Sequence, residues 1–365
     1  MNPTDADIRR SCRFALSRAA PATATDTLKR LAASRHASEA IDVYGDNGAV
    51  ARLQDAASRR LGKQAGLFFI KGVIAQLCVL QVHAQARRCR NVVIHPLSHL
   101  DVDEQGAAER VASLNLIRLG RQRHFDARML DALTEPLAAV VVELPLRRAG
   151  FLLPPIERLR AISAWCRARG VPLHFDGARI WESSAGYGMD VAELAELADS
   201  VYVSWYKGLG GLGGALVAGH TDFIDALRVW KTRYGGDLFT AYPYAIAALE
   251  GLDTLLPRLP EFVQRARTLA AGLADIARLH VHPSPPHTNA FQVWLPGTPD
   301  ILAAHHRAFA TGHGVWLFDA FSEAPLSGHA LAEIQIGADS DAYDVDEAVE
   351  AVRRFVSSLP VRESD

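Results

Sequence analysis

The sequence contains few cysteines and no motif that would pair them. The cysteines stand far apart, without a CxxC spacing, at Cys12, Cys78, Cys89 and Cys166. Scattered cysteines argue against a disulfide framework and against a structural zinc site, because both need closely grouped thiols. We therefore expect reduced, mostly buried thiols and no bound metal.

Long apolar runs and an excess of one charge are also lacking. No stretch reaches the roughly 20 apolar residues of a membrane-spanning helix. Residues 1–7 lack the basic start and apolar block of a secretory signal peptide. The 39 basic and 41 acidic residues nearly cancel, so nothing in the charge balance favours nucleic acid or an anionic membrane as a partner. The sequence predicts a globular cytoplasmic protein.

A regular alternation of strand-like and helix-like segments is present. β-Branched and aromatic runs predict strands, and apolar residues at helical spacing predict helices. In the first part of the chain, strands are predicted at 65–70, 91–95, 137–143, 171–175 and 200–205, and helices at 73–81, 155–169 and 192–197. This alternation indicates an α/β fold with a mostly parallel central sheet that has helices on both faces.

The length of 365 residues suits one large and one smaller domain. We expect an N-terminal arm at 1–40 that packs on the main domain or on a partner subunit, a large domain at 41–257, and a small α+β domain at 258–365. Ligands of open parallel sheets collect at the carboxyl ends of the strands. Residues just beyond those ends are therefore the candidates for a functional site.

Lys207 is the first such candidate. It follows the predicted strand 200–205 and precedes a glycine-rich turn, and no charged residue lies between Asp199 and Lys207. Burial lowers the pKa of a lysine, and the neutral amine attacks carbonyls, so Lys207 could form a Schiff base with a substrate or with pyridoxal phosphate. The alternative is an ordinary solvated loop lysine.

The glycine cluster at 208–213 matches the GxGxxG pattern of dinucleotide-binding folds. That pattern needs a helix that opens inside the glycine run, so that the helix N-terminus meets the pyrophosphate. Here the glycines lead into 214–219, which has the composition of another strand. We therefore interpret the cluster as a tight turn that leaves room beside Lys207.

Asp176 ends the predicted strand 171–175, and Arg179 follows three residues later. An aspartate at this place could pair with the protonated ring nitrogen of a cofactor, which would make the ring a stronger electron sink. An arginine there could bind a carboxylate through two hydrogen bonds. The alternative is a structural Asp–Arg pair.

Two further positions follow predicted strands. His99 could stack on a planar ring or shuttle a proton, although most loop histidines do neither. Gly72 opens a predicted helix, where the amides of Val73 and Ile74 could bind phosphate, although the segment also suits an ordinary strand-to-helix turn. A phosphate site, a ring-stacking histidine, a ring-nitrogen aspartate and a Schiff-base lysine together match the requirements of pyridoxal phosphate.

These motifs resemble, in the same order, a family of pyridoxal-phosphate enzymes with the aspartate aminotransferase fold, fold type I. Within that fold the resemblance is to the threonine aldolase and β-eliminating lyase group. The resemblance rests on five features of the family, namely a DxYG motif at 42–46, a phosphate loop at 69–76, a ring-stacking histidine at 99, an HxDGAR signature at 173–179 and an SxxKGLG signature at 204–210. The resemblance is close over roughly residues 40–260 and loose over the C-terminal domain.

The resemblance implies a role for each matching residue. Lys207 would hold the cofactor as an internal aldimine, Asp176 would bind its pyridinium nitrogen, and His99 would lie on the ring face. Gly72 and Val73 would bind the phosphate. Lys207, His99 and Asp176 are therefore the expected catalytic residues.

The resemblance also implies contacts with the substrate and with a second subunit. Arg179 would bind the substrate α-carboxylate. Because the active sites of the family lie at a dimer interface, a homodimer or homotetramer is expected. Tyr44 would then contact the substrate, and Arg233 the cofactor, of the neighbouring subunit.

The sequence departs from the family pattern at several positions. Leu146 stands where threonine aldolases have the histidine of an ENTH motif, and no arginine or lysine occurs between Arg307 and Arg353, where a second carboxylate-binding arginine is expected. Lys71 and Val73 replace small hydroxyl residues of the phosphate loop, and the N-terminal RSDT stretch has no counterpart. These departures concern the substrate more than the cofactor.

The resemblance implies cleavage of a β-hydroxy-α-amino acid to glycine and an aldehyde. The base for the hydroxyl group stays open among His95, His174 and a water molecule. Leu144, Leu146 and Phe151 suggest a bulkier or less polar substrate than threonine. The alternatives are another reaction of the same cofactor, namely β-elimination, transamination or racemisation, or a catalytically weak protein that binds pyridoxal phosphate.

Overall fold

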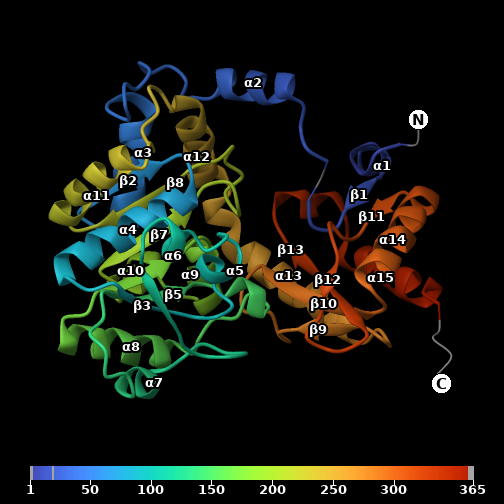
Figure 1. The fold of residues 1–365 in the computed structure, drawn as a ribbon. Coiled ribbons are helices and arrows are strands. Elements are labelled where there is room, and N and C mark those ends of the chain that lie inside the picture. Colours follow the sequence, from blue (N-terminus) through green and yellow to red (C-terminus); the bar gives the residue numbers. More distant parts are fainter. Residues whose placement is uncertain (1–2, 19, 361–365) are drawn as a thin grey trace. The chain divides into compact units, whose positions relative to one another are not determined.

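The computed structural model describes residues 3–18 and 20–360, which form two compact units (Figure 1). One unit comprises residues 27–257, and the other combines the described residues up to 26 with 258–360. Residues 1, 2 and 19 of the expected arm, and 361–365 of the expected small domain, lie outside the described residues.

The segment 1–40, expected as one arm, is divided between the two units. Strand β1 (Phe14–Ala15) pairs in parallel with β11 (Val315–Trp316). Ile8, in helix α1 (Asp5–Ser11), packs in one buried cluster with Ala310 and Trp316. The apolar side chains of this early segment therefore complete the core of the C-terminal unit, whereas residues 27–40 belong to the large unit.

A seven-stranded sheet forms the centre of the large unit. Its spatial order is β2 (Ala65–Phe69), β8 (Ala215–Gly219), β7 (Ser200–Ser204), β6 (Leu173–Asp176), β5 (Ala139–Glu143), β3 (Asn91–Ile94) and β4 (Asn115–Arg118). Only β8 runs against the other six strands. The predicted fold class, a mostly parallel α/β sheet, is therefore confirmed.

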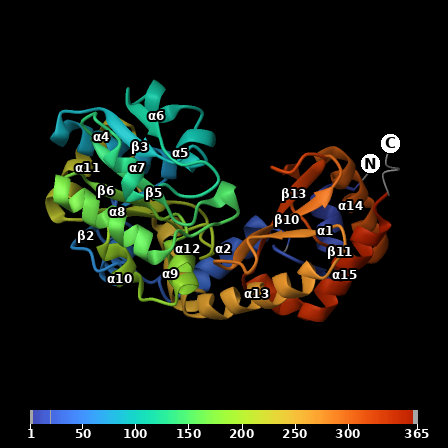
Figure 2. The ribbon, with the colours of Figure 1, turned by 90° about the horizontal axis from the view of Figure 1, so that it is seen from below.

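Helices lie on both sides of this sheet (Figures 1 and 2). The longer ones are α3 (Gly48–Arg60), α4 (Gly72–Arg87), α8 (Ile156–Arg169), α11 (Thr221–Arg233) and α12 (Tyr242–Thr254). The shorter ones include α5 (His99–Val102), α6 (Ala107–Arg110), α7 (Ala127–Asp131), α9 (Ile180–Tyr187) and α10 (Val191–Glu196). Strand β5 is buried along its whole length, which explains its continuous run of valines rather than an alternating pattern.

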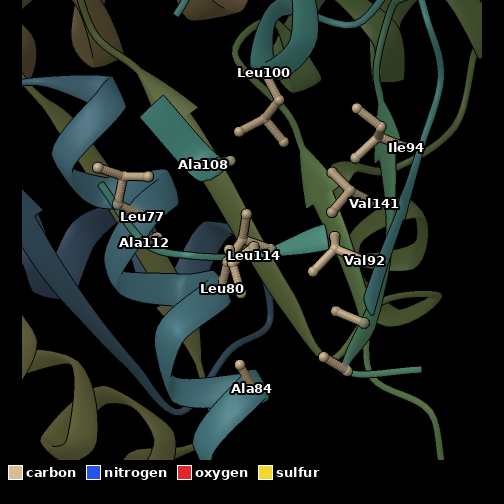
Figure 3. Packing of buried hydrophobic residues seen from close by; sticks show 12 residues of the cluster. Leu77, Leu80, Ala84, Val92, Ile94, Leu100, Ala108, Ala112, Leu114 and Val141 are labelled. Atoms are coloured by element: carbon tan, nitrogen blue, oxygen red, sulfur yellow. The ribbon is translucent and has the colours of Figure 1, made fainter. Parts of the chain in front are cut away.

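Helix α4 is held to the sheet by a buried apolar cluster (Figure 3). Leu77 and Leu80 of α4 pack with Val92, Ile94 and Val141 of the central strands. Burying a leucine side chain contributes about 1.5–3 kcal/mol. This packing fixes the first turn of α4, which follows β2 directly, relative to the ends of the strands.

The carboxyl ends of four adjacent parallel strands meet at one edge of the sheet. Glu143 and Asp176 are the last residues of β5 and β6, and they are paired in register. His99 begins α5 shortly after β3, and Lys207 follows β7. The topology therefore brings these four side chains together, as expected for ligand sites of open α/β sheets.

The second unit contains a four-stranded antiparallel sheet. Its spatial order is β12 (Ser322–Glu323), β13 (His329–Gln335), β10 (Ala290–Pro296) and β9 (His280–His282). The helices of this unit are α1, α13 (Leu259–Ala274), α14 (Pro299–His313) and α15 (Val345–Ser358). Across residues 3–18 and 20–360, no helix has the length and apolar character needed to cross a bilayer.

Candidate active site

A pocket lies at the carboxyl ends of the parallel strands. Its lining residues are His99, Asp103, Glu143, Leu144, Pro145, Arg147, Asp176, Ala178, Arg179 and Lys207. The structure thus brings together four of the residues predicted from the sequence, namely His99, Asp176, Arg179 and Lys207.

Lys207 lies in a tight turn whose backbone is closed by hydrogen bonds. The Gly211 amide donates to the Trp205 carbonyl oxygen over 2.8 Å, and strand β8, not a helix, follows the glycines. Burial, with the nearby Arg179 charge, lowers the pKa of Lys207 to about 8, although the Asp176 carboxylate opposes this. The turn therefore presents an amine that is partly neutral near physiological pH.

The glycine next to Lys207 is required by a buried carboxylate. A methyl group on Gly208 would lie 2.0 Å from Oε1 of Glu182, a side chain of helix α9 that is almost fully buried. Burial raises the pKa of Glu182, while the Arg179 charge lowers it. Glu182 thus links the Lys207 turn to the segment that carries Arg179, and sequence reasoning did not identify it.

Asp176 presents an open hydrogen-bond acceptor inside the protein. Its Oδ1 atom is buried and has no hydrogen-bond partner among the described residues. Burial raises the pKa of Asp176, while the charges of Lys207 and His99 lower it. A buried acceptor of this kind costs free energy unless a bound group supplies the missing proton.

His99 is held in place by two carboxylates. Its Nδ1 lies 2.9 Å from Oε1 of Glu104, and its backbone amide donates to Oε2 of Glu143 over 2.7 Å. The hydrogen bond with Glu104 raises the pKa of His99. The imidazole is therefore oriented at the pocket wall and keeps a proton more readily than a free histidine.

Glu143 is a pocket residue that sequence reasoning did not single out. It is buried, and its two oxygens accept the backbone amides of His99 and Arg147. Burial, together with the neighbouring Asp176 charge, raises the pKa of Glu143 to about 7. Its place at the end of the predicted strand 137–143 was the available sequence signal, because polar residues at strand ends line such sites.

The predicted phosphate-binding turn lies at the start of α4, where Gly72 is the first helical residue. The preceding Lys71 makes no side-chain cap, so the helix N-terminus offers the amides of Val73 and Ile74 to an anion. A methyl group on Gly72 would lie 2.2 Å from the Tyr202 hydroxyl oxygen. Only glycine therefore fits at this position without displacing the buried tyrosine.

Four residues predicted for the site do not line this pocket, namely Gly72 and Val73 at the start of α4, Tyr44 and Arg233. The Arg233 guanidinium lies 4.6 Å from the Trp230 ring centroid and lines a separate pocket beside α4. Tyr44 is 58% exposed and packs edge-on against Phe239. Asp42 supports the Tyr44 turn by accepting hydrogen bonds from Thr240 and from the backbone amide of Ala241. The roles of Tyr44 and Arg233 at a neighbouring subunit stay predictions.

The two histidines considered as hydroxyl bases are committed elsewhere, and neither lines the pocket. His95 accepts the Leu97 amide at Nδ1 and contacts the Arg123 carbonyl oxygen through Nε2. His174 is fully buried between Ser200 and Gln76, and burial lowers its pKa to about 3. The geometry therefore contradicts a role for either ring as the base.

The pocket is more polar than the sequence suggested. Seven of its ten lining side chains are ionisable. Of the three apolar residues expected on the substrate side, Leu144 lines the pocket, whereas Leu146 and Phe151 are fully buried and do not. Phe151 instead packs under Arg179, with its ring centroid 5.2 Å from Cζ. The expectation of a less polar substrate is not supported by this lining.

The residues present fit pyridoxal phosphate. The buried, unpartnered Oδ1 of Asp176 matches the protonated ring nitrogen, and the uncapped helix start at Gly72 matches the phosphate. Lys207, with its lowered pKa, matches the aldehyde carbon. These groups come from separate strand ends and are assembled only by the fold.

The lowered pKa of Lys207 predicts how the apo-protein should react. Below pH 8 the amine is mostly protonated and cannot attack an aldehyde, so loading with pyridoxal phosphate should accelerate as the pH rises through about 8. Arg179→Gln removes a repelling cation and should move this midpoint upward. Stopped-flow absorbance across a pH series measures the midpoint of the loading rate in the wild type and in Arg179→Gln. A wild-type midpoint near 10.5, the ordinary pKa of lysine, contradicts the assignment of Lys207 as the reacting amine.

Comparison with solved structures shows the same fold in other proteins. The chain superimposes with a TM-score of 0.89 on the crystal structure of a candidate L-allo-threonine aldolase from Listeria monocytogenes, at 30% sequence identity over 96% of this chain and 97% of that one. A threonine aldolase from Leishmania major has a TM-score of 0.70 at 17% identity, which shows the shared fold.

Curated relatives of this chain are also named threonine aldolases. The low specificity L-threonine aldolase of Escherichia coli O157:H7 is 29% identical over 253 residues, which are 65% of this chain and 74% of the relative. Low-specificity L-threonine aldolase 1 of Arabidopsis thaliana is 26% identical over 259 residues, 68% of this chain and 72% of the relative.

A family model settles the membership. The model described as β-eliminating lyase matches residues 23–295, about three quarters of the chain. Members of this family are pyridoxal-phosphate enzymes, which confirms the cofactor predicted from the sequence. The chain therefore belongs to the β-eliminating lyase family, whose members include the threonine aldolases.

Proposed function

We propose that the protein is a pyridoxal-phosphate-dependent aldehyde-lyase that cleaves the Cα–Cβ bond of a β-hydroxy-α-amino acid to glycine and an aldehyde. The observation that carries this proposal is the placement of Lys207, Asp176 and Arg179 around one pocket in a chain of this family. Similarity to proteins named as threonine aldolases supports cleavage of this same Cα–Cβ bond.

Residues of the pocket and of the start of α4 together hold the cofactor. Lys207 anchors the cofactor, Gly72 and Val73 hold its phosphate, and His99 covers its ring. Asp176 keeps the ring nitrogen protonated. When bound, pyridoxal phosphate supplies an electron sink for the bond that breaks at Cα.

Two other groups position the substrate for cleavage. Arg179 binds the α-carboxylate through its guanidinium. Glu143 accepts the proton of the β-hydroxyl group, because its pKa of about 7 makes it available as a base and it lines the pocket that His95 and His174 do not reach.

The protein is further proposed to act as a cytoplasmic homo-oligomer, a dimer or a tetramer, with Tyr44 and Arg233 serving the neighbouring subunit. Exposed apolar side chains near Tyr44 support a contact surface on the large unit, namely Ile41, Val43, Phe239 and Tyr242. Light scattering of the purified protein tests the oligomeric state.

The lyase reaction is tested with purified, cofactor-loaded protein. L-Threonine, L-allo-threonine and β-phenylserine should each release glycine and the matching aldehyde, measured by amino-acid analysis and by a coupled alcohol dehydrogenase assay. Ammonia with a keto acid indicates β-elimination instead. A requirement for an amino acceptor indicates transamination, and a change of chirality without bond cleavage indicates racemisation.

A further inference from the structure

A second arginine lines the pocket beside Arg179. Arg147 begins the short helix η1 (Arg147–Ala149) after β5, its backbone amide donates to Oε1 of Glu143 over 3.1 Å, and its side chain lines the pocket. The next residue, Arg148, pairs with Asp103 and does not line the pocket. Two adjacent arginines thus have different surroundings.

The order of the strands places Arg147 on one flank of the pocket. Strands β7, β6, β5 and β3 are neighbours in that order, and they are followed by Lys207, Arg179, Arg147 and His99 respectively. The charge of Arg179 acts on Asp176, Glu182 and Lys207. The charge of Arg147 also acts on Lys207, and it acts on Asp103 together with the charges of Arg148 and His99. The order of the strands therefore places Arg147 between Arg179 and His99 along this edge of the sheet.

This arrangement orients a substrate when combined with the proposed function, on which the following step rests. With the cofactor bound, Lys207 would give up its place to the substrate amino group, and Arg179 would bind the α-carboxylate. The remaining substituent on Cβ then extends toward the flank of Arg147, Glu143 and His99. A methyl group gains little from this charged lining, whereas a carboxylate can accept two hydrogen bonds from a guanidinium.

We propose that Arg147 binds an anionic group at the end of the substrate side chain, so that the preferred substrates are β-hydroxy amino acids with a second carboxylate. In 3-hydroxyaspartate the Cα–Cβ bond breaks, the hydroxyl proton passes to the base, and Cα takes up a proton. The products are glycine and glyoxylate, with no oxidant or second substrate required.

A pair of substrates that differ by one group tests this proposal. L-Threonine and L-threo-3-hydroxyaspartate differ only in a methyl group against a carboxylate, so we expect kcat/KM to favour the hydroxyaspartate by roughly 10- to 100-fold, the scale of a hydrogen bond to a charged group. Arg147→Gln should erase this preference, measured as the ratio of the two kcat/KM values within the variant. Arg148→Gln, the matched control, should keep the wild-type preference.

Binding without cleavage separates this proposal from the lyase assignment. L-Aspartate and L-2-aminobutyrate have side chains of similar size, lack the β-hydroxyl group, and can be titrated through the absorbance of the bound cofactor. Aspartate should bind tighter by a similar factor in the wild type and in Arg148→Gln but not in Arg147→Gln. Tighter aspartate binding without glycine release from any hydroxy acid overturns the lyase assignment alone. Equal affinities, or an aspartate preference that survives in Arg147→Gln, overturn the role of Arg147.

Discussion

Replacing Lys207 by alanine should abolish catalysis, with kcat lower by roughly 10⁴-fold or more, the scale of losing a covalent catalytic residue. The reason lies in its surroundings. Lys207 lines the pocket, and burial beside Arg179 lowers its pKa to about 8, which keeps part of the amine neutral and reactive near physiological pH. Glycine release under saturating substrate measures the loss.

Lys63 provides a matched control for this substitution. It is also a partly buried lysine whose pKa is lowered by burial, but its ammonium donates to the Ala198 carbonyl oxygen and it does not line the pocket. Borohydride reduces a Schiff base and so attaches the cofactor permanently to its lysine. Lys63→Ala should keep its activity, and borohydride should still label the peptide that contains Lys207. A Lys207→Ala protein that still cleaves substrate, or a wild-type label on another peptide, contradicts the assignment.

The central sheet was predictable from sequence because its strands are buried on both faces. Continuous apolar runs such as Val140 to Val142 leave little choice but a covered parallel strand. Strand β4 was not predicted, because Asn115 and Arg118 at its ends are exposed, as an edge strand allows, and carry no apolar signal. Pairing of β1 with β11 depends on a contact between residues about 300 apart, which local patterns do not contain.

The candidate site was predictable where a residue type and a strand end coincide. Lys207, Asp176 and His99 met both conditions, and the structure places all three at one pocket. His174 was misjudged because strand alternation puts it on the same face as Asp176, two residues before the end of the strand. At that depth Gln76 of α4 covers it. Alternation indicates a face, but only the packed helix shows which part of the face is open.

Arg147 shows the opposite limitation. No local pattern distinguishes it from Arg148, and both follow a strand end in the sequence. What separates them is the turn after β5, where the Arg147 amide is fixed on Glu143 and the Arg148 side chain is drawn to Asp103. Substrate preference therefore depends on a turn geometry that composition does not reveal.

Replacing Asp176 by asparagine should lower kcat by roughly 10²- to 10³-fold, the scale of removing one electrostatic stabiliser of a transition state. The buried Oδ1 atom presents a charged acceptor to the ring nitrogen. An amide at the same place cannot hold a proton there, so the ring draws electrons less strongly. Cofactor content should change little, because Lys207 and the start of α4 are untouched, and the visible absorbance of the loaded protein measures this.

The charge of the ring nitrogen can also be supplied chemically, which distinguishes an electrostatic role for Asp176 from a structural one. Asp176→Ala leaves space beside the nitrogen, and loading this variant with N-methylated pyridoxal phosphate provides a permanently cationic ring. If Asp176 acts by maintaining that charge, the methylated cofactor should recover much of the lost kcat in Asp176→Ala and none in Lys207→Ala. The opposite outcome is an Asp176→Ala protein that loads the methylated cofactor and shows no more activity than with natural pyridoxal phosphate. That result indicates that Asp176 is needed for the fold of the pocket rather than for its charge.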